Sequence, residues 1–118
     1  MSEALREVQS RRRRYRHGGR PVSPSGRAAI VVDQSIGPGH AMAGAIRLLR
    51  DAKPSMIVAA APVASEAGAR RFEGTVNRMV CLHREAELGP LDRYYGKAGQ
   101  ISHEEALECL ARAADDEP

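Results

Sequence analysis

The residues best suited to chemistry lie in a turn that follows a run of apolar residues. Asp33 comes directly after the apolar run 28–32, Gly37 and Gly39 lie in the turn, and an amphipathic helical pattern begins at His40. Glycine allows the backbone to approach a ligand closely, and the first turn of a helix presents unpaired N–H groups and the positive end of the helix dipole. This arrangement predicts a site for a phosphate or another anion.

Alternating strands and helices must position this turn. Apolar runs predict strands at residues 28–32, 56–63 and 78–82, the first of them buried on both faces and the second ending near Pro62. A helix is predicted at residues 40–52, where it ends before Pro54, and a short helix capped by Ser65 is predicted to run to about residue 72. This order predicts an α/β fold: a parallel sheet of about three strands with right-handed crossovers, flanked by helices as in a doubly wound sheet.

The flanking segments are polar or charged. The sequence predicts a basic helix at residues 3–16 and a connector rich in Gly, Pro and Ser at residues 17–26. It predicts a long loop at residues 83–100. Ser102 and Glu105 have the spacing of a capping box at the start of a last helix. The predicted organisation is a basic N-terminal helix or arm with its connector at 1–26, an α/β domain at 27–114 and an acidic tail at 115–118.

Positive charge is concentrated near the N-terminus. The net charge is +3, and the first twenty residues hold seven arginines against two glutamates, so the rest of the chain is nearly neutral. Attraction to a polyanion would therefore come from the arm and would weaken with salt. Two interpretations stay open, a solvated basic helix or a contact with nucleic acid through Arg11, Arg12, Arg13, Arg14 and Arg16.

Cysteine usage and hydropathy argue against a secreted protein, a membrane protein and a zinc-binding protein. The two cysteines, Cys81 and Cys109, are expected to be free thiols of a cytoplasmic protein, because the first twenty residues contain no apolar run of a signal peptide. No apolar run approaches the roughly 18 residues of a membrane span, so no membrane association is predicted. Cys81 and His83 lie two residues apart but lack the further paired ligands of a structural zinc site, so no metal site is predicted.

The turn resembles the phosphoribosyl-diphosphate loop of the type I phosphoribosyltransferases. In that loop an apolar run is followed by two acids, Gly, two variable positions, Thr, Gly, a variable position and Thr. Asp33 matches the first acid and Gly39 matches the last glycine. Four positions depart from the pattern: Gln34 stands in place of the second acid, Ser35 of the first glycine, Pro38 of the first threonine and Ala41 of the second.

The resemblance continues beyond the turn. Residues 56–65 are similar to the "IVVAVPVAP" strand of the family and residues 78–82 to its "VVCL" strand. Residues 94–105 are similar to the "YYEDFSQVSDEE" ending of one bacterial subgroup, although Lys97-Ala98 stands near the position of the Asp-Phe pair. The similarity covers roughly residues 10–112 and corresponds to the C-terminal half of the usual family domain.

The resemblance implies a ribosyl transfer in which a cation-like sugar forms and diphosphate leaves. The ligand would be phosphoribosyl diphosphate or the 5′-phosphate of a nucleotide, with Mg²⁺ as cofactor only if the protein is active. The family pattern places the ribose at Asp33, the candidate catalytic residue, and at Gln34, and places the 5′-phosphate at Gly37, Gly39, His40 and Ala41. The departures remove two or three charge-assisted bonds of about 1.5–3 kcal/mol each, which predicts reduced or lost transferase activity.

Other interpretations of the same residues stay open. Gly37 and Gly39 could form only a tight turn from strand to helix, with Asp33 capping that turn. The chain could be a non-catalytic regulatory or nucleic-acid-binding module that uses its arginine-rich arm, or an inactive fragment of a truncated gene. Half of a sheet also leaves exposed edges, which predicts a homodimer or a partner that completes the sheet.

Overall fold

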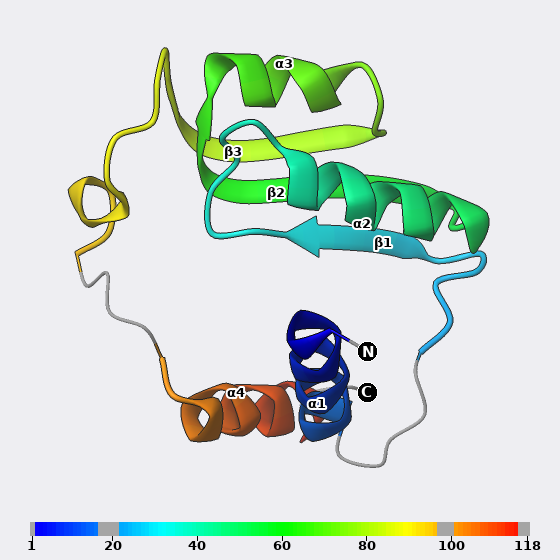
Figure 1. Ribbon diagram of the computed structural model, residues 1–118. Helices are drawn as coiled ribbons and strands as arrows, with labels where there is room; N and C mark the ends of the chain where they lie inside the picture. The colour runs from blue at the N-terminus through cyan, green and yellow to red at the C-terminus, as the bar shows by residue number, and fades with distance from the viewer. Residues whose placement is uncertain (1, 17–21, 97–100, 116–118) are drawn as a thin grey trace. The chain divides into compact units, whose positions relative to one another are not determined.

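The computed structural model describes residues 2–16, 22–96 and 101–115 (Figure 1). The chain divides into two compact units, one formed by residues 1–22 with 99–118 and the other by residues 23–98. The predicted connector at 17–26 and the acidic tail at 115–118 fall partly outside the described residues. The larger unit contains the sheet and the predicted anion site, whereas the smaller unit contains a helix from each end of the chain.

The sheet of the larger unit has three parallel strands, as the sequence predicts. They are β1 (Ala28–Val32), β2 (Met56–Ser65) and β3 (Arg78–Glu85), in the spatial order β1-β2-β3. Ala28 pairs with Met56, and Val58 pairs with Arg78. Strands β2 and β3 extend beyond the predicted ends because the polar residues 83–85 of β3 pair with residues 63–65 of β2.

Pro62 lies inside the central strand rather than near its end. The last residue of β1, Val32, pairs with Ala60, so no β1 residue stands opposite Pro62. Proline has no backbone N–H, but the ladder between β1 and β2 needs no donor at this position, so no hydrogen bond is lost. On the other side the pairs Ala61 with Cys81 and Val63 with His83 continue past it.

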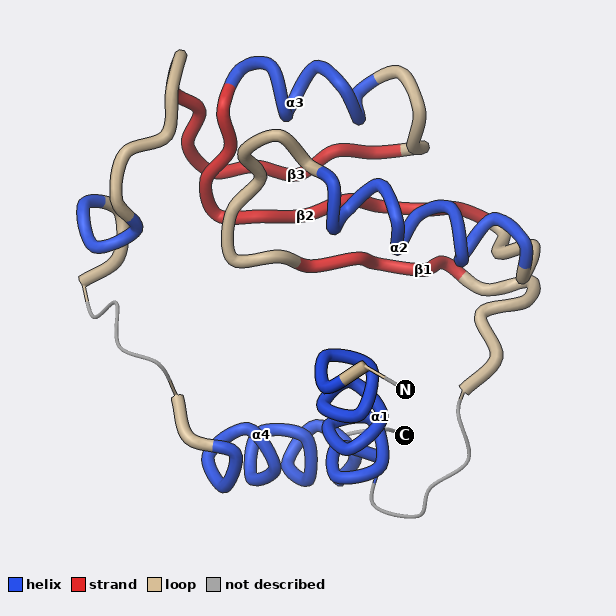
Figure 2. The backbone as a smooth tube through the Cα atoms, viewed as in Figure 1, coloured by secondary structure: helices blue, strands red, loops and turns tan. Residues whose placement is uncertain are grey.

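Both crossover helices of the larger unit pack on the same face of the sheet. Helix α2 (His40–Asp51) joins β1 to β2, and helix α3 (Glu66–Glu73) joins β2 to β3 (Figures 1 and 2). Two right-handed crossovers that advance in one direction along a sheet bring their helices to one side. The buried residues that form the core between these helices and the sheet are Ile36, Met42, Ile46, Ile57, Ala59, Ala61, Ala64, Ala69 and Phe72.

Within the larger unit the opposite face of the sheet is uncovered, which contradicts the prediction that the first strand is buried on both faces. Exposure alternates along β1, and Ile30 and Val32 are 65% and 71% exposed. Leu82 of β3 is 84% exposed. Continuous apolar runs are typical of strands covered on both sides, but no helix of the larger unit covers this side among its described residues. The face therefore presents an apolar surface.

The smaller unit consists of α1 (Glu3–Arg16) and α4 (His103–Asp115). The predicted capping box is present, since the Ser102 N–H donates to Glu105 Oε2 at 2.9 Å and the Glu105 N–H donates to Ser102 Oγ at 3.1 Å. A short 3₁₀ helix, η1 (Leu91–Arg93), belongs to the larger unit. No helix in the described ranges has the length and hydrophobicity needed to cross a membrane.

Candidate functional site

The predicted anion site is a bend of the backbone at the carboxyl end of β1, formed by residues 33–39 and followed by α2. The Asp33 N–H donates to the Ala60 carbonyl at 3.0 Å, and the Ile36 N–H donates to the Val63 carbonyl at 3.0 Å. The Ser65 N–H in turn donates to the Ile36 carbonyl at 2.8 Å. The bend is thus held along β2 at the edge where open parallel sheets bind ligands.

Gly39 gives the bend its shape. It is buried and adopts a left-handed conformation with φ of 85°, immediately before the first residue of α2. A Cβ atom at this position would lie 2.6 Å from Cε2 of Phe72. Both the dihedral angle and the close approach of α3 therefore require glycine here.

The N-terminus of α3 supports the bend from the side of β2. Ser65 Oγ accepts from the Gly68 N–H at 3.0 Å, as predicted for a helix cap, and also donates to the Gly37 carbonyl at 3.1 Å. Gly68 lies so close that a Cβ atom would be 2.3 Å from the Gly37 carbonyl oxygen. The sequence indicated the cap but not this second bond, because the pairing of Ser65 with Gly37 depends on tertiary structure.

The N–H groups at the start of α2 are available to a ligand. Helix α2 has no side-chain cap, and Ala43 is the first residue whose N–H bonds back to the bend, at 2.9 Å from the Gly39 carbonyl. No residue within the described ranges accepts a hydrogen bond from the N–H of Gly37, Gly39, His40 or Ala41. Unpaired N–H groups at a helix N-terminus attract anions.

Asp33 and Gln34 lie side by side at the start of the bend. Asp33 is half-buried, and its Oδ1 accepts from the Gln34 N–H at 2.7 Å, so the carboxylate caps the turn locally. The Gln34 carbonyl accepts from the Tyr95 hydroxyl at 2.5 Å, while the rest of the residue is exposed. The second oxygen of Asp33 accepts no hydrogen bond from the described part of the chain and can still meet a ligand hydroxyl.

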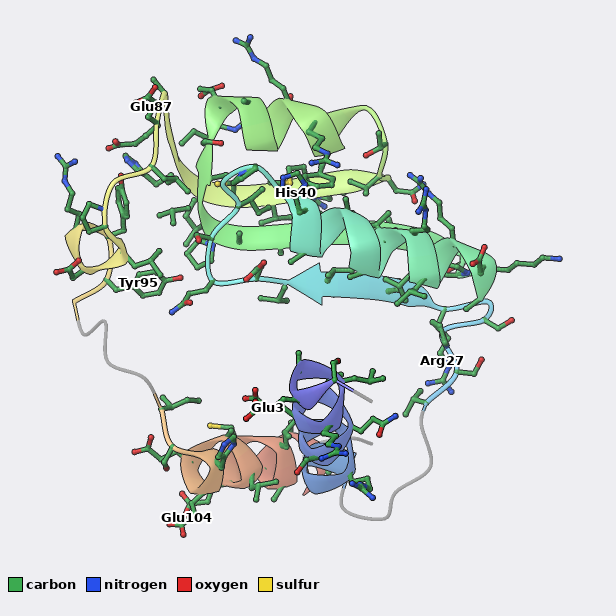
Figure 3. All side chains as sticks on the ribbon, in the orientation of Figure 1. Glu3, Arg27, His40, Glu87, Tyr95 and Glu104 are labelled. Atoms are coloured by element: carbon green, nitrogen blue, oxygen red, sulfur yellow. The ribbon has the colours of Figure 1, made fainter. Side chains whose placement is uncertain are left out.

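Two basic side chains lie next to the bend. His40 is exposed at the first position of α2 (Figure 3). Arg71 of α3 donates from Nη1 to the Pro38 carbonyl at 2.7 Å, and its guanidinium carbon lies 5.6 Å from the centre of the Phe72 ring. The sequence did not single out Arg71, because nothing in its spacing indicates that α3 folds back onto the bend.

A polar cluster lies at the carboxyl end of β3. Glu85 Oε1 lies 3.0 Å from His83 Nε2, and Glu85 Oε2 accepts from the Tyr94 hydroxyl at 3.2 Å. The hydrogen bond with His83, and after it the one with Tyr94, holds the pKa of Glu85 below its ordinary value. These residues line a cavity of about 480 Å³ together with Arg93. Tyr94 therefore makes a specific hydrogen bond in this cluster, whereas Tyr95 bonds to the Gln34 carbonyl at the bend.

The remaining sequence candidates lie elsewhere. Cys81 is half-buried in β3 and Cys109 is exposed in α4, and both are free thiols as predicted. Within the described ranges no three His, Cys, Asp or Glu side chains are grouped as metal ligands would be. Arg13 is exposed on α1 of the smaller unit, and the side chains of Arg11, Arg12, Arg14 and Arg16 lie outside what the structure describes.

Comparison with known proteins relates the chain to phosphoribosyltransferases. Two proteins from strains CDC 1551 / Oshkosh and ATCC 25618 / H37Rv of Mycobacterium tuberculosis, both named "Putative phosphoribosyl transferase", are 30% identical to it over 112 residues. That alignment covers 95% of this chain but 25% of each relative, so the chain spans about a quarter of their length. No protein family model matches the sequence.

Solved structures show the same fold. The crystal structure of TT1426 from Thermus thermophilus is 25% identical and superposes with a TM-score of 0.81, over 92% of this chain and 52% of that one. The AQ2163 protein from Aquifex aeolicus is 18% identical with a TM-score of 0.53, over 64% of this chain and 36% of that one. The fold is therefore shared with larger proteins, and the named relatives support a phosphoribosyltransferase-like relationship.

Proposed function

We propose that this protein is a phosphoribosyltransferase-like domain that binds phosphoribosyl diphosphate, or the 5′-phosphate of a nucleotide, at the bend between β1 and α2. The observation that carries the proposal is the set of unpaired N–H groups at Gly37, Gly39, His40 and Ala41. The two relatives named phosphoribosyl transferase support the same ligand class. The first turn of every α-helix leaves N–H groups without an intrahelical partner, and here no side chain caps them, so they stay open to an anion.

Each residue of the bend has a separate role in this proposal. The backbone of Gly37, Gly39 and Ala41 donates to the phosphate, and the exposed imidazole of His40 adds a charge-assisted bond when protonated. Asp33 contacts the ribose through its free oxygen. Arg71, held against the Pro38 carbonyl, adds positive potential beside the phosphate.

We further propose that transferase activity is reduced or lost, because three positions of the bend and of the start of α2 lack groups that the reaction uses. Gln34 removes one negative charge that would face the sugar cation. Pro38 has no N–H, and its carbonyl accepts from Arg71, so it offers no donor to the phosphate. Ala41 lacks a hydroxyl. Each lost charge-assisted bond weakens phosphate binding by about 1.5–3 kcal/mol.

Magnesium would enter this site with the diphosphate. Asp33 supplies the one carboxylate of the bend, and the described residues include no cluster of three metal-ligating side chains. A Mg²⁺ ion usually keeps several waters and takes one or two carboxylates together with substrate phosphates, so the bend fits an ion that the ligand carries. When bound, the ion would neutralise charge on the leaving diphosphate.

We also propose that the open sheet face is covered by a second copy of this chain or by a partner chain that completes the sheet. The face carries Ile30, Val32 and Leu82, each more than half exposed, and β1 and β3 each have a free edge in the described sheet. TT1426 has about twice the length of this chain. Apolar surface of this kind favours association.

Calorimetric titration with phosphoribosyl diphosphate and magnesium tests the proposed function. Wild-type protein is expected to bind with a Kd of about 1 mM, near −4 kcal/mol. The double variant Gln34→Asp and Ala41→Thr restores two residues of the family pattern and should bind about tenfold more tightly or better. Both positions are exposed, so the variant should fold.

A threonine elsewhere on the same helix provides the matched control. Leu48→Thr changes an exposed residue of α2 away from the bend and should leave the affinity within about twofold of wild type. Absence of saturable binding in both the wild type and the double variant would reject the proposal. An equal effect of Leu48→Thr and of the double variant would also reject it.

A further inference from the structure

A second basic feature of the larger unit is a cleft of about 510 Å³ between α2 and α3. Arg47, Arg50 and Arg71 line it, together with His40 and one acid, Asp51. With the histidine neutral, the lining therefore carries an excess of two positive charges. The volume is typical of clefts that bind small molecules.

The arginines of this cleft are not neutralised by carboxylates. Arg50 donates to the Thr75 carbonyl and Arg71 to the Pro38 carbonyl, so backbone oxygens hold both guanidinium groups in place. Arg47 makes no ion pair or hydrogen bond with any residue in the described ranges. Two arginines of the same unit outside the cleft do pair with carboxylates, Arg70 with Glu66 and Arg84 with Glu73.

The spacing of the cationic groups favours a ligand with several negative groups. His40 and Arg50 are ten residues apart on α2, which corresponds to about 15 Å along the helix axis at 1.5 Å per residue. A single phosphate cannot contact both ends of such a row. Guanidinium groups bind phosphate in a bidentate manner, and two of these groups are already positioned by the backbone.

Gly44 keeps the cleft open in the middle of this row. It lies inside α2, and a Cβ atom at this position would meet no atom within 4 Å. Glycine in a helix interior costs about 0.5–1 kcal/mol relative to alanine, and here no packing contact requires it. Gly44 lines the same cleft as Arg47 and Arg71, so its missing side chain leaves room there for a ligand.

We propose that this cleft binds a small ligand that carries two or more linked phosphate groups, such as a nucleoside triphosphate or an inorganic oligophosphate. The cleft shares His40 and Arg71 with the proposed sugar-phosphate site, but Arg47 lies seven residues, or about 10 Å, along α2 from His40 and belongs to the cleft alone. It does not depend on transferase chemistry. Substitution of Arg47 therefore distinguishes binding in the cleft from binding at the bend.

Calorimetric titration with inorganic tripolyphosphate, and in parallel with adenosine triphosphate, tests this proposal on the full chain. Arg47→Gln removes an arginine that pairs with no described residue, and Gly44→Leu fills the cleft without a clash at Cβ. Each change should weaken both probes about tenfold or more, the equivalent of one charge-assisted bond. Arg70→Gln on α3, outside the cleft lining, is the matched control and should change either affinity by less than about twofold.

Amide chemical shifts distinguish this site from the bend. Tripolyphosphate should shift the amides of Ala43 and Gly44, and Arg47→Gln should abolish those shifts while shifts caused by ribose 5-phosphate at residues 37–41 persist. Absence of saturable tripolyphosphate binding would overturn the proposal. Equal affinities of Arg47→Gln and Arg70→Gln would overturn it as well, and in either case the result from ribose 5-phosphate would still decide the function proposed for the bend.

Discussion

Replacing Gly39 with alanine tests whether the bend has the shape on which its ligand depends. Gly39 has φ of 85° and is buried, and an added methyl group would lie 2.6 Å from Cε2 and 2.9 Å from Cζ of Phe72. Phe72 belongs to the core and is 2% exposed, so its ring has little space to retreat. The substitution therefore introduces both backbone strain and overpacking at one point.

The two effects can be given magnitudes. A left-handed conformation costs a non-glycine residue about 1–2 kcal/mol, and an extra methyl group in a packed core costs about 1–3 kcal/mol. Gly39→Ala should accordingly reduce the free energy of unfolding of the larger unit by about 2–5 kcal/mol. Gly44→Ala is the matched control on the same helix, where no atom lies within 4 Å of the new methyl group. It should raise that free energy by about 0.5–1 kcal/mol.

Urea unfolding followed by NMR provides the assay. The chain has no tryptophan, and the methyl resonances of Ile36 and Ile46, which are 1% and 3% exposed, report on the core of the larger unit alone. A loss of less than about 1 kcal/mol in Gly39→Ala would refute the reasoning. So would a control that is destabilised as much as Gly39→Ala, because the effect would then not depend on φ or on Phe72.

Three further changes have defined outcomes. Ser65→Ala removes the cap of α3 and the bond to the Gly37 carbonyl, and should lower the free energy of unfolding in urea by about 1–2 kcal/mol; a loss below about 0.5 kcal/mol would contradict this role. Leu82→Lys charges a residue that is 84% exposed on the open sheet face, and should weaken any self-association seen by sedimentation velocity, whereas a wild-type monomer at high concentration would argue against the dimer. The pKa of Glu85 is lowered chiefly by its bond with His83. The ionised carboxylate therefore stabilises the folded state above the ordinary pKa of Glu85, and this stabilisation is lost as the pH falls through the lowered pKa of the folded state. Glu85→Gln should therefore flatten the pH dependence of unfolding below about pH 4.5, and an unchanged profile would contradict the assigned interaction.

The bounds of β1 and α2 could be predicted from the sequence because local signals define them. The apolar run begins at Ala28, the glycines follow, and Pro54 prevents the helix from continuing, so both elements have the predicted bounds up to one residue. The ends of β2 and β3 could not be predicted in the same way. Polar residues such as Arg84 belong to the sheet because the neighbouring strand β2 pairs with them. This pairing depends on tertiary structure, which the local sequence does not indicate.

The candidate site was predictable where it depends on the backbone and not where it depends on side chains from elsewhere. The two glycines and the helix start are adjacent in sequence, so the sequence places the bend. Arg71 and Gly68 reach it from α3, thirty residues or so away, and no local pattern indicates that approach. The open sheet face also depends on the strand order, which places both crossover helices on one side.

The most direct test of the central claim is an amide NMR titration of the wild-type protein with ribose 5-phosphate. The claim predicts saturable shifts concentrated at the amides of Gly37, Gly39, His40 and Ala41, with small changes in β3 and α4. Unchanged resonances at residues 37–41 at millimolar ligand would contradict the claim. The N–H donors at the start of α2 would then not bind a sugar phosphate.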